Sequence, residues 1–186
     1  WVGRMVGLKR LDLLVEAVSS LHRGGRRVKL YLLGDGPKRG SVSAYAESLG
    51  LGSVVDFVGP VSQDHLPEWY SAADATVLCS DSEGLPNVLR ESLACGTPFV
   101  ATNVGSISEF APPDCSQLAK PGDVSGLAAG MTTILQPGFR VAAGLYRSRT
   151  WSECAHETAD LLATLIRNRD IRSDVAAVEP RLDLEA

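Results

Sequence analysis

Apolar residues recur at helical spacing along much of the chain. In the stretch 12–22 the apolar positions are separated by three and four residues, which places them on one face of a helix. The same spacing returns in later stretches, and Asp64 stands where it could cap one of them. The pattern predicts helices over residues 12–22, 38–49, 64–73, 123–135, 141–147 and 151–167, and one more within 80–102.

Short apolar runs lie between these helices and predict buried strands over residues 28–33, 54–58, 75–78, 99–101 and 117–119. Strands that alternate with helices indicate βαβ units with right-handed crossovers. We therefore predict an α/β fold: a doubly wound, Rossmann-like parallel sheet with helices on both faces. Ligands of such sheets bind at the carboxyl ends of the strands. The loops expected to meet there are residues 3–9, 34–37, 59–61, 80–87 and 102–109.

The stretch from Ser80 to Thr102 has the features of a ligand site. It reads as a loop after a buried strand, a helix, and a tight return into the next strand. A helix N-terminus offers unpaired N–H groups and a partial positive charge, so it can bind a phosphate. Glu83 and Glu91 flank this helix start; they would repel a phosphate but accept hydrogen bonds from hydroxyl groups. Phosphate and hydroxyl groups together indicate a nucleotide sugar.

Composition narrows the class of protein. The 186 residues suffice for one well-buried domain, and 45% of them are hydrophobic, as in globular rather than disordered chains. The net charge of −4 argues against a nucleic-acid partner, because binding to the phosphate backbone needs clustered Lys and Arg. No apolar run reaches the roughly 18 residues of a membrane span, and no signal peptide is recognisable. The four cysteines and three histidines lack metal-ligand spacing, so we expect no metal site.

The chain begins at Trp1, without a Met and already inside an apolar, glycine-containing pattern. We therefore expect a piece of a longer protein. Taken together, VGR with KRLDLLVEA downstream, YLLGDGP, VDFVGPVSQDHLPEWYSAADATVL and EGLPNVLRESLACGTPFVATNVGSISE carry a resemblance that runs from Trp1 to about Glu109. In these segments the chain resembles the C-terminal, donor-binding domain of retaining glycosyltransferases with the GT-B fold, glycosyltransferase family 4 or group 1. The most specific feature is the Glu-x7-Glu pair of Glu83 and Glu91.

The resemblance implies a catalytic role for three residues. Arg4 and Lys9 match the cationic pair that holds the donor diphosphate and neutralises the charge that grows as the sugar–phosphate bond breaks. Glu83 matches the glutamate that accepts hydrogen bonds from the donor sugar, and Glu91 the one that binds the ribose. Further substrate-binding positions are implied at Gly3, Gly34, Val58, Gly59, Gly84, Leu85, Pro86, Asn87 and Val88.

Ordinary structural explanations stay open for these residues. The two cations would suit a solvated basic loop, Glu83 a helix cap, and Glu91 an exposed salt bridge. The glycines of GDGP are common in strand-to-helix turns, and the pair Trp69 and Tyr70 favours helix packing over a sugar platform. Two positions depart from the family's pattern: Cys79 where relatives often have proline, and Ser106 where a second glycine is common.

The resemblance also implies the activity of the longer protein. It is expected to be a hexosyltransferase-like enzyme that moves a sugar from a nucleoside-diphosphate sugar to an acceptor hydroxyl, with retention and with no cofactor beyond the donor. Residues 1–167 would be the donor-binding domain and residues 168–186 a polar extension. An N-terminal acceptor domain of the same protein, absent here, would close the cleft, so this chain alone is expected to be inactive. A cytoplasmic location is implied, with peripheral association with the inner face of the membrane left open.

Two other functions are compatible with the predicted fold. A binding module, from a degenerate or regulatory relative, would bind nucleotides without a preference for their sugar. A dinucleotide-dependent oxidoreductase would need G-x-G-x-x-G at the start of a helix after the first strand, and the GDGP segment lacks the third glycine.

Overall fold

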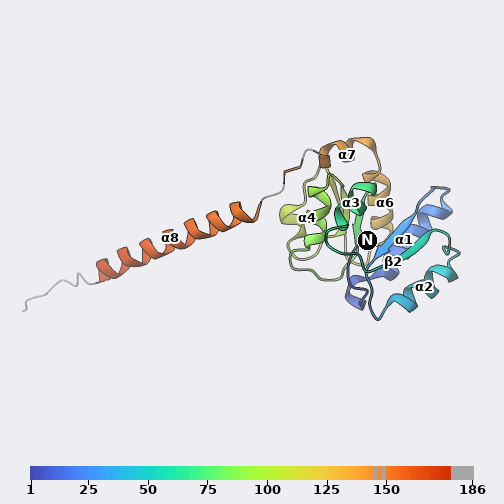
Figure 1. Ribbon diagram of the computed structural model, residues 1–186, viewed down its shortest axis with the longest axis horizontal. Coiled ribbons are helices and arrows are strands. Elements are labelled where there is room, and N and C mark those ends of the chain that lie inside the picture. Colours follow the sequence, from blue (N-terminus) through green and yellow to red (C-terminus); the bar gives the residue numbers. More distant parts are fainter. Residues whose placement is uncertain (145, 148–149, 177–186) are drawn as a thin grey trace, which may run out of the picture. The chain divides into compact units, whose positions relative to one another are not determined.

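The computed structural model of the protein describes residues 1–144, 146–147 and 150–176, and it divides into two compact units (Figure 1). The first unit, Trp1–Arg147, contains all the described strands, and the second, Ser148–Ala186, contains helix α8 (Trp151–Ala176). The elements of the first unit are, in chain order, η1 (Gly7–Lys9), α1 (Leu11–Arg23), β1 (Leu30–Leu33), α2 (Arg39–Ser48), β2 (Val55–Gly59), α3 (Leu66–Ala72), β3 (Thr76–Leu78), α4 (Asn87–Ala94), β4 (Phe99–Thr102), α5 (Ile107–Phe110), β5 (Ser116–Ala119), α6 (Val124–Ile134) and α7 (Pro137–Gly144).

All pairings between these strands are parallel. β1 pairs with β2 in one ladder, and β3, β4 and β5 form a second ladder in that order. Val2 adds an isolated parallel bridge to Leu33, at the end of β1. Parallel strands joined by helices are what the alternating sequence pattern predicts, so the Rossmann-like α/β fold is confirmed.

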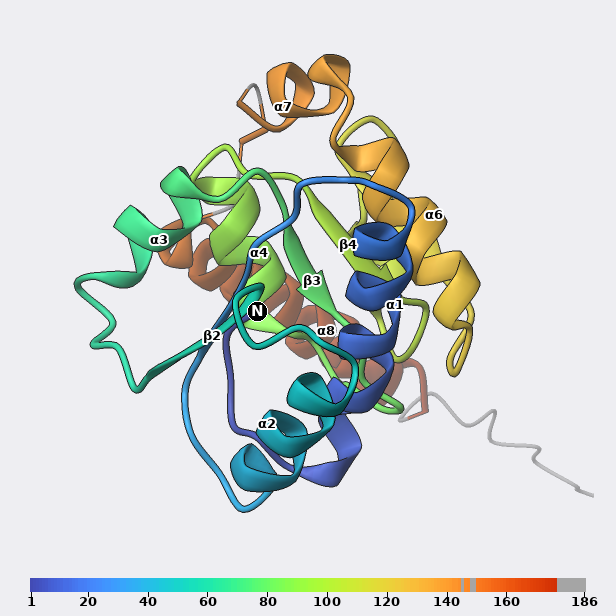
Figure 2. The same ribbon diagram turned by 90° about the vertical axis from the view of Figure 1, so that its right-hand side faces the viewer.

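The two faces of the strands bury different helices. Val77 and Val100 share a core cluster with α1 and α6, whereas their neighbours Leu78, Phe99 and Ala101 share another with α4. Side chains alternate between the faces of a strand, so each of these strands is buried on both sides. Figure 2 shows α4 on one side of β3 and β4, and α1 and α6 on the other. β3 and β4 are thus covered by helices on both faces, as in a doubly wound fold.

Several predicted boundaries are wrong. α3 begins at Leu66 and Asp64 does not cap it, because residues 62–65 form a turn of their own in which His65 N–H donates to the Ser62 carbonyl. α7 occupies residues 137–144 rather than 141–147. The short helices η1 and α5 replace predicted loops.

α8 also continues beyond its predicted end at Arg167, to Ala176. It therefore includes residues 168–176 of the predicted polar extension, 168–186, and residues 177–186 lie outside the described part of the chain. Among the described residues, no helix is both long and apolar enough to cross a membrane.

Candidate functional site

The main chain joins the ends of β1 and β2 and the segment that follows Val2. Gly34 N–H donates to the Gly59 carbonyl at 2.7 Å, and Gly3 N–H donates to the Leu33 carbonyl at 2.9 Å. A Cβ on Gly34, whose φ is +122°, would lie 1.9 Å from the Gly3 oxygen. The glycines of GDGP are therefore needed for the close approach of protein main chain, which is their structural explanation. Val58, next to Gly59, is 38% exposed at this end of β2.

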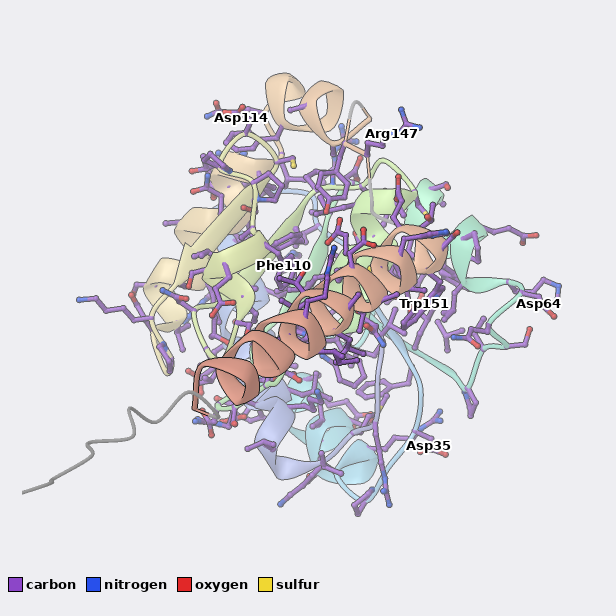
Figure 3. All side chains as sticks on the ribbon, turned by 90° about the vertical axis from the view of Figure 1, so that its left-hand side faces the viewer. Asp35, Asp64, Phe110, Asp114, Arg147 and Trp151 are labelled. Atoms are coloured by element: carbon purple, nitrogen blue, oxygen red, sulfur yellow. The ribbon has the colours of Figure 1, made fainter. Side chains whose placement is uncertain are left out.

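The direction of the strands fixes which loops share this edge. Figure 3 shows Asp35, which follows β1, and Asp114, which precedes β5, on opposite sides of the first unit. The residues predicted to bind substrate follow strands rather than precede them. They therefore belong to the carboxyl edge, where ligands of parallel sheets bind.

A second set of contacts joins the residues around Lys9 to the loop after β3. Asp81 N–H donates to the Leu8 carbonyl at 2.9 Å. The thiol of Cys79 lies 3.1 Å from the carbonyls of both Lys9 and Arg10. Burial raises the pKa of this thiol to about 12, so it stays protonated and can donate. Cys79 thus serves as a small, buried hydrogen-bond donor between two loops.

The structure brings Lys9 and Glu83 together. Lys9 Nζ lies 2.5 Å from Glu83 Oε1, with the two side chains 23% and 11% exposed. Ser80 Oγ donates to the same carboxylate oxygen at 2.5 Å, and the Ser80 carbonyl accepts from Thr102 Oγ1 at 2.6 Å. Ser80 and Thr102 are completely buried, so the side chains that support the Glu83 carboxylate are held firmly by the surrounding protein. A ligand phosphate near Lys9 would therefore compete with Glu83 for the ammonium group.

Arg4, the other predicted cation, is exposed. Within the described residues its guanidinium forms no hydrogen bond or ion pair with another side chain. An unpaired guanidinium at the carboxyl edge is available to an anion, and its fork of donors suits phosphate oxygens.

The start of α4 is open toward solvent. Pro86, which suits a first helical turn because it lacks an N–H, is instead the N-cap, one residue before α4 begins at Asn87, and no side chain caps the helix. Leu89 N–H donates to the Pro86 carbonyl, but the amides before it in the helix have no intrahelical carbonyl to bind. Pro86 is buried, whereas Gly84 and Asn87 are exposed and Leu85 is 51% exposed. The helix end can therefore receive an anion without first losing a side-chain cap.

The loop after β4 supports the residues that precede α4. Ser106 N–H donates to the Gly84 carbonyl at 3.2 Å. A Cβ on Gly105, whose φ is +57°, would lie 2.0 Å from the main-chain carbonyl oxygen of Glu83. The close approach therefore requires glycine at position 105, and Ser106, with φ −87°, is accommodated. Val88, in the first turn of α4, is partly buried beside this loop.

Glu91 is held by a tyrosine. Its Oε2 accepts from the Tyr70 hydroxyl at 3.0 Å, and Tyr70 is only 3% exposed. Burial, followed by the charge and hydrogen bond of Glu91, raises the pKa of Tyr70. In the described residues no hydrogen bond or ion pair joins Glu91 to Lys9 or Glu83. The site thus has two carboxylates, each supported by its own hydrogen-bond donor. The sequence indicates only helix packing for Tyr70, so its role in holding Glu91 is missed.

The arrangement combines two chemistries at one edge. Arg4, Lys9 and the uncapped start of α4 favour an anion, whereas the two glutamates favour hydroxyl donors. No group of His, Cys, Asp and Glu in the described residues is arranged to hold a metal ion. A cleft of about 860 Å³, lined mostly by apolar side chains, lies between β1 and β3, and none of the predicted site residues lines it.

Known proteins resemble the chain in sequence and in fold. The model of the family "Glycosyl transferases group 1" matches residues 1–137. D-inositol 3-phosphate glycosyltransferase 2 of Catenulispora acidiphila is 35% identical over 187 residues, which cover 90% of this chain and 43% of that protein. 2-Deoxystreptamine glucosyltransferase of Streptomyces kanamyceticus is 32% identical over 155 residues, with coverages of 81% and 39%.

Solved structures agree in fold. Sucrose-phosphate synthase of Thermosynechococcus elongatus superposes with a TM-score of 0.72 at 27% identity, over 90% of this chain and 45% of that one. HepE of Anabaena, solved with UDP and glucose, gives a TM-score of 0.75 at 21% identity, over 88% and 47%. The chain spans less than half the length of each of these proteins.

Proposed function

The chain belongs to the glycosyl transferases group 1 family, and from this we propose that it is the donor-binding half of a retaining GT-B glycosyltransferase of family 4. The longer protein would transfer a sugar from a nucleoside-diphosphate sugar to an acceptor hydroxyl. One observation carries the proposal. An exposed guanidinium, the paired Lys9 and Glu83, and an uncapped helix start lie on loops that follow strands, and the Lys9–Glu83 pair joins the loops of the two ladders.

Each group has a distinct part in the proposed reaction. Arg4, Lys9 and the N-terminus of α4 would bind the diphosphate and stabilise the charge left on it as the sugar departs. Glu83 would accept hydrogen bonds from the sugar, and Glu91, oriented by Tyr70, from the ribose hydroxyls. The proposal therefore includes no metal ion and no cofactor besides the donor substrate.

Lys9 has to change partners when the donor binds. Its ammonium group is held by Glu83 in this structure, at 2.5 Å. A diphosphate carries more negative charge than a single carboxylate, so it would attract Lys9 and leave Glu83 free to accept from a sugar hydroxyl. Binding of the phosphate and recognition of the sugar would thereby be coupled through one ion pair.

The other positions would complete the donor site through the main chain and through shape. Gly84, Leu85, Asn87 and Val88 are proposed to approach the diphosphate and sugar, and Val58 with Gly59 to lie near the base.

The relatives take different acceptors by their names, an inositol phosphate and a 2-deoxystreptamine. The acceptor would be selected by a second domain of the longer protein. A cytoplasmic location, with or without peripheral membrane association, belongs to the same proposal and rests on the family resemblance.

Calorimetry of this chain with uridine, guanosine and adenosine diphosphates tests the proposal. One of them should bind, and Lys9→Ala should weaken it at least about tenfold, as expected for loss of a charge-assisted hydrogen bond. Glu91→Ala should weaken it through the ribose. Lys29→Ala is the control, because Lys29 pairs with Asp56 through a 2.9 Å contact outside the proposed site.

Three outcomes would count against the proposal. Absence of nucleotide binding, or binding unchanged in both variants, would refute the site. Rapid turnover of a nucleotide sugar by this chain alone would refute the need for a second domain. Nucleotide binding without sugar preference or turnover in the longer protein would favour a binding module instead.

A further inference from the structure

Arg10 has an unusual backbone conformation. It is the one non-glycine residue with positive φ in the described part of the chain, at φ 45° and ψ 47°. It stands between η1 and α1, directly after Lys9. The left-handed conformation costs a side chain of this kind about 1–2 kcal/mol. Such strain persists only where surrounding contacts hold the residue in place.

The Arg10 side chain provides such contacts. Its Nε and Nη2 donate to Asp12 at 2.9–3.2 Å, within the start of α1. Its Nη1 reaches across to the loop after β3 and donates to Asp81 at 3.1 and 3.3 Å. The hydrogen bonds with Asp12, and to a smaller extent those with Asp81, raise the pKa of Arg10. One guanidinium therefore joins two segments that are 71 residues apart in the chain.

The segments joined by Arg10 and Asp81 are the ones that carry Lys9 and Glu83. Arg10 adjoins Lys9, and Asp81 lies between Ser80 and Glu83, the two residues whose side chains share a hydrogen bond. We propose that Arg10 and Asp81 are positioning residues for the diphosphate. Their ion pair holds the Lys9 loop and the Glu83 loop at the separation a bound diphosphate needs. This inference rests on the proposed function.

The Arg10–Asp81 pair adds to the hydrogen bonds that join Asp81 to Leu8 and Cys79 to the residues beside Lys9, and it differs from the Lys9–Glu83 pair in what a ligand does to it. When a diphosphate takes the ammonium of Lys9, the Lys9–Glu83 pair no longer holds the two loops together. The Arg10–Asp81 pair keeps its partners in that state, because neither residue is assigned to the ligand. It acts on ligand binding rather than on global stability, since an ion pair with side chains 31% and 43% exposed contributes little to folding.

Two variants separate the pair from the backbone strain. Arg10→Gly removes the guanidinium and also the cost of the left-handed conformation, and Asp81→Asn removes only the charge of an exposed side chain. Each should weaken the best-binding nucleoside diphosphate about three- to tenfold by calorimetry. The corresponding nucleoside, followed by NMR titration, should bind as it does to the unmodified chain, because it lacks the phosphates. The variant that carries both substitutions should bind the nucleoside diphosphate no more weakly than the weaker-binding single variant does.

Two matched controls remove a carboxylate elsewhere. Asp12→Asn loses the other partner of Arg10, and Asp56→Asn loses a comparably exposed ion pair with Lys29. Both should leave the ratio of diphosphate to nucleoside affinity unchanged, and Asp81→Glu should restore part of the lost affinity.

The outcomes separate this inference from the proposed function. If the chain binds a nucleoside diphosphate and that ratio is unchanged in Arg10→Gly and Asp81→Asn, the positioning role is wrong and the proposed function stands. An equal loss of nucleoside and diphosphate affinity would indicate a merely structural pair and would also overturn it. If the unmodified chain binds no nucleoside diphosphate, the proposed function fails, and this inference with it.

Discussion

Two loops lead from a strand into a helix at the same edge of the first unit, and glycine has a different role in each. In the loop between β1 and α2, the space beside Gly34 and Gly36 is filled by the main chain of residues 3 and 5. In the loop between β3 and α4, Gly84 is exposed, and a Cβ added to it would meet no atom within 4 Å. The first loop is closed by the protein, and the second is open to a ligand.

The two loops differ in charge and in unpaired main-chain groups rather than in glycine content. A glycine-rich turn after a strand is shared by packing and by binding, so it does not separate them. The loop between β3 and α4 differs in carrying Glu83 before an uncapped helix and in facing Lys9. Charge combined with unsatisfied main chain distinguishes the loop that we propose to bind the donor, and glycine alone does not.

Substitution of the loop glycines by alanine should have the largest effect, and it tests the contrast between the two loops through protein stability. Gly34→Ala would place a Cβ 1.9 Å from the Gly3 oxygen, so the two segments would have to separate. We expect a loss of at least about 3 kcal/mol in the free energy of unfolding, or a fall in Tm of about 6–12 °C. Gly84→Ala should change the free energy of unfolding by less than about 0.5 kcal/mol. Thermal denaturation followed by circular dichroism measures both.

The reverse order of these effects on stability would contradict the contrast between the two loops. If Gly84→Ala were the more destabilising substitution, the loop before α4 would be packed rather than open. If Gly34→Ala were neutral, the contact with Gly3 would be able to relax, and the GDGP glycines would again be candidates for contact with a nucleotide.

A smaller effect concerns the carboxylates of the two loops. Glu83→Gln removes the charge that holds Lys9, so bare nucleoside diphosphate should bind about threefold more tightly, as expected for loss of a weak competing ion pair. The preference for nucleotide sugar over bare diphosphate should fall about tenfold, because a charged acceptor of the sugar hydroxyls is lost. Calorimetry with both ligands gives the two affinities.

Asp35→Asn is the matched control in the other loop. Asp35 accepts a hydrogen bond from Gly36 N–H at 2.8 Å, and an asparagine oxygen can accept the same bond. Neither affinity should change. Similar results for the two variants would mean that the loops do not differ in function.

The sequence predicts the fold and the loops of the site for physical reasons that are local. Apolar periodicity sets the strands and helices, and the parallel topology then brings the loops after strands to one edge. The left-handed Arg10 and its bond to Asp81 depend on residues 71 apart in the chain, which no local pattern encodes. The turn before α3 likewise competes with Asp64 as a cap through a hydrogen bond from His65 to Ser62.

Tyr70 illustrates the same limit and gives the smallest expected effect. Its sequence context indicates a packed aromatic, and it is indeed buried, but its hydroxyl also supports Glu91 at 3.0 Å. Tyr70→Phe should cost about 1 kcal/mol of stability, since a buried hydrogen bond is lost. It should weaken nucleoside binding two- to threefold if Glu91 binds the ribose, as followed by NMR titration.

Tyr45→Phe separates the two consequences, because Tyr45 donates to Glu16 at 2.5 Å in a second Tyr–Glu pair outside the proposed site. That variant should leave nucleoside affinity unchanged. Equal affinities in both variants would mean that Tyr70 only packs α3 against α4. A loss confined to Tyr70→Phe would instead extend the proposed binding site from the loop before α4 to α3, through the hydrogen bond from Tyr70 to Glu91.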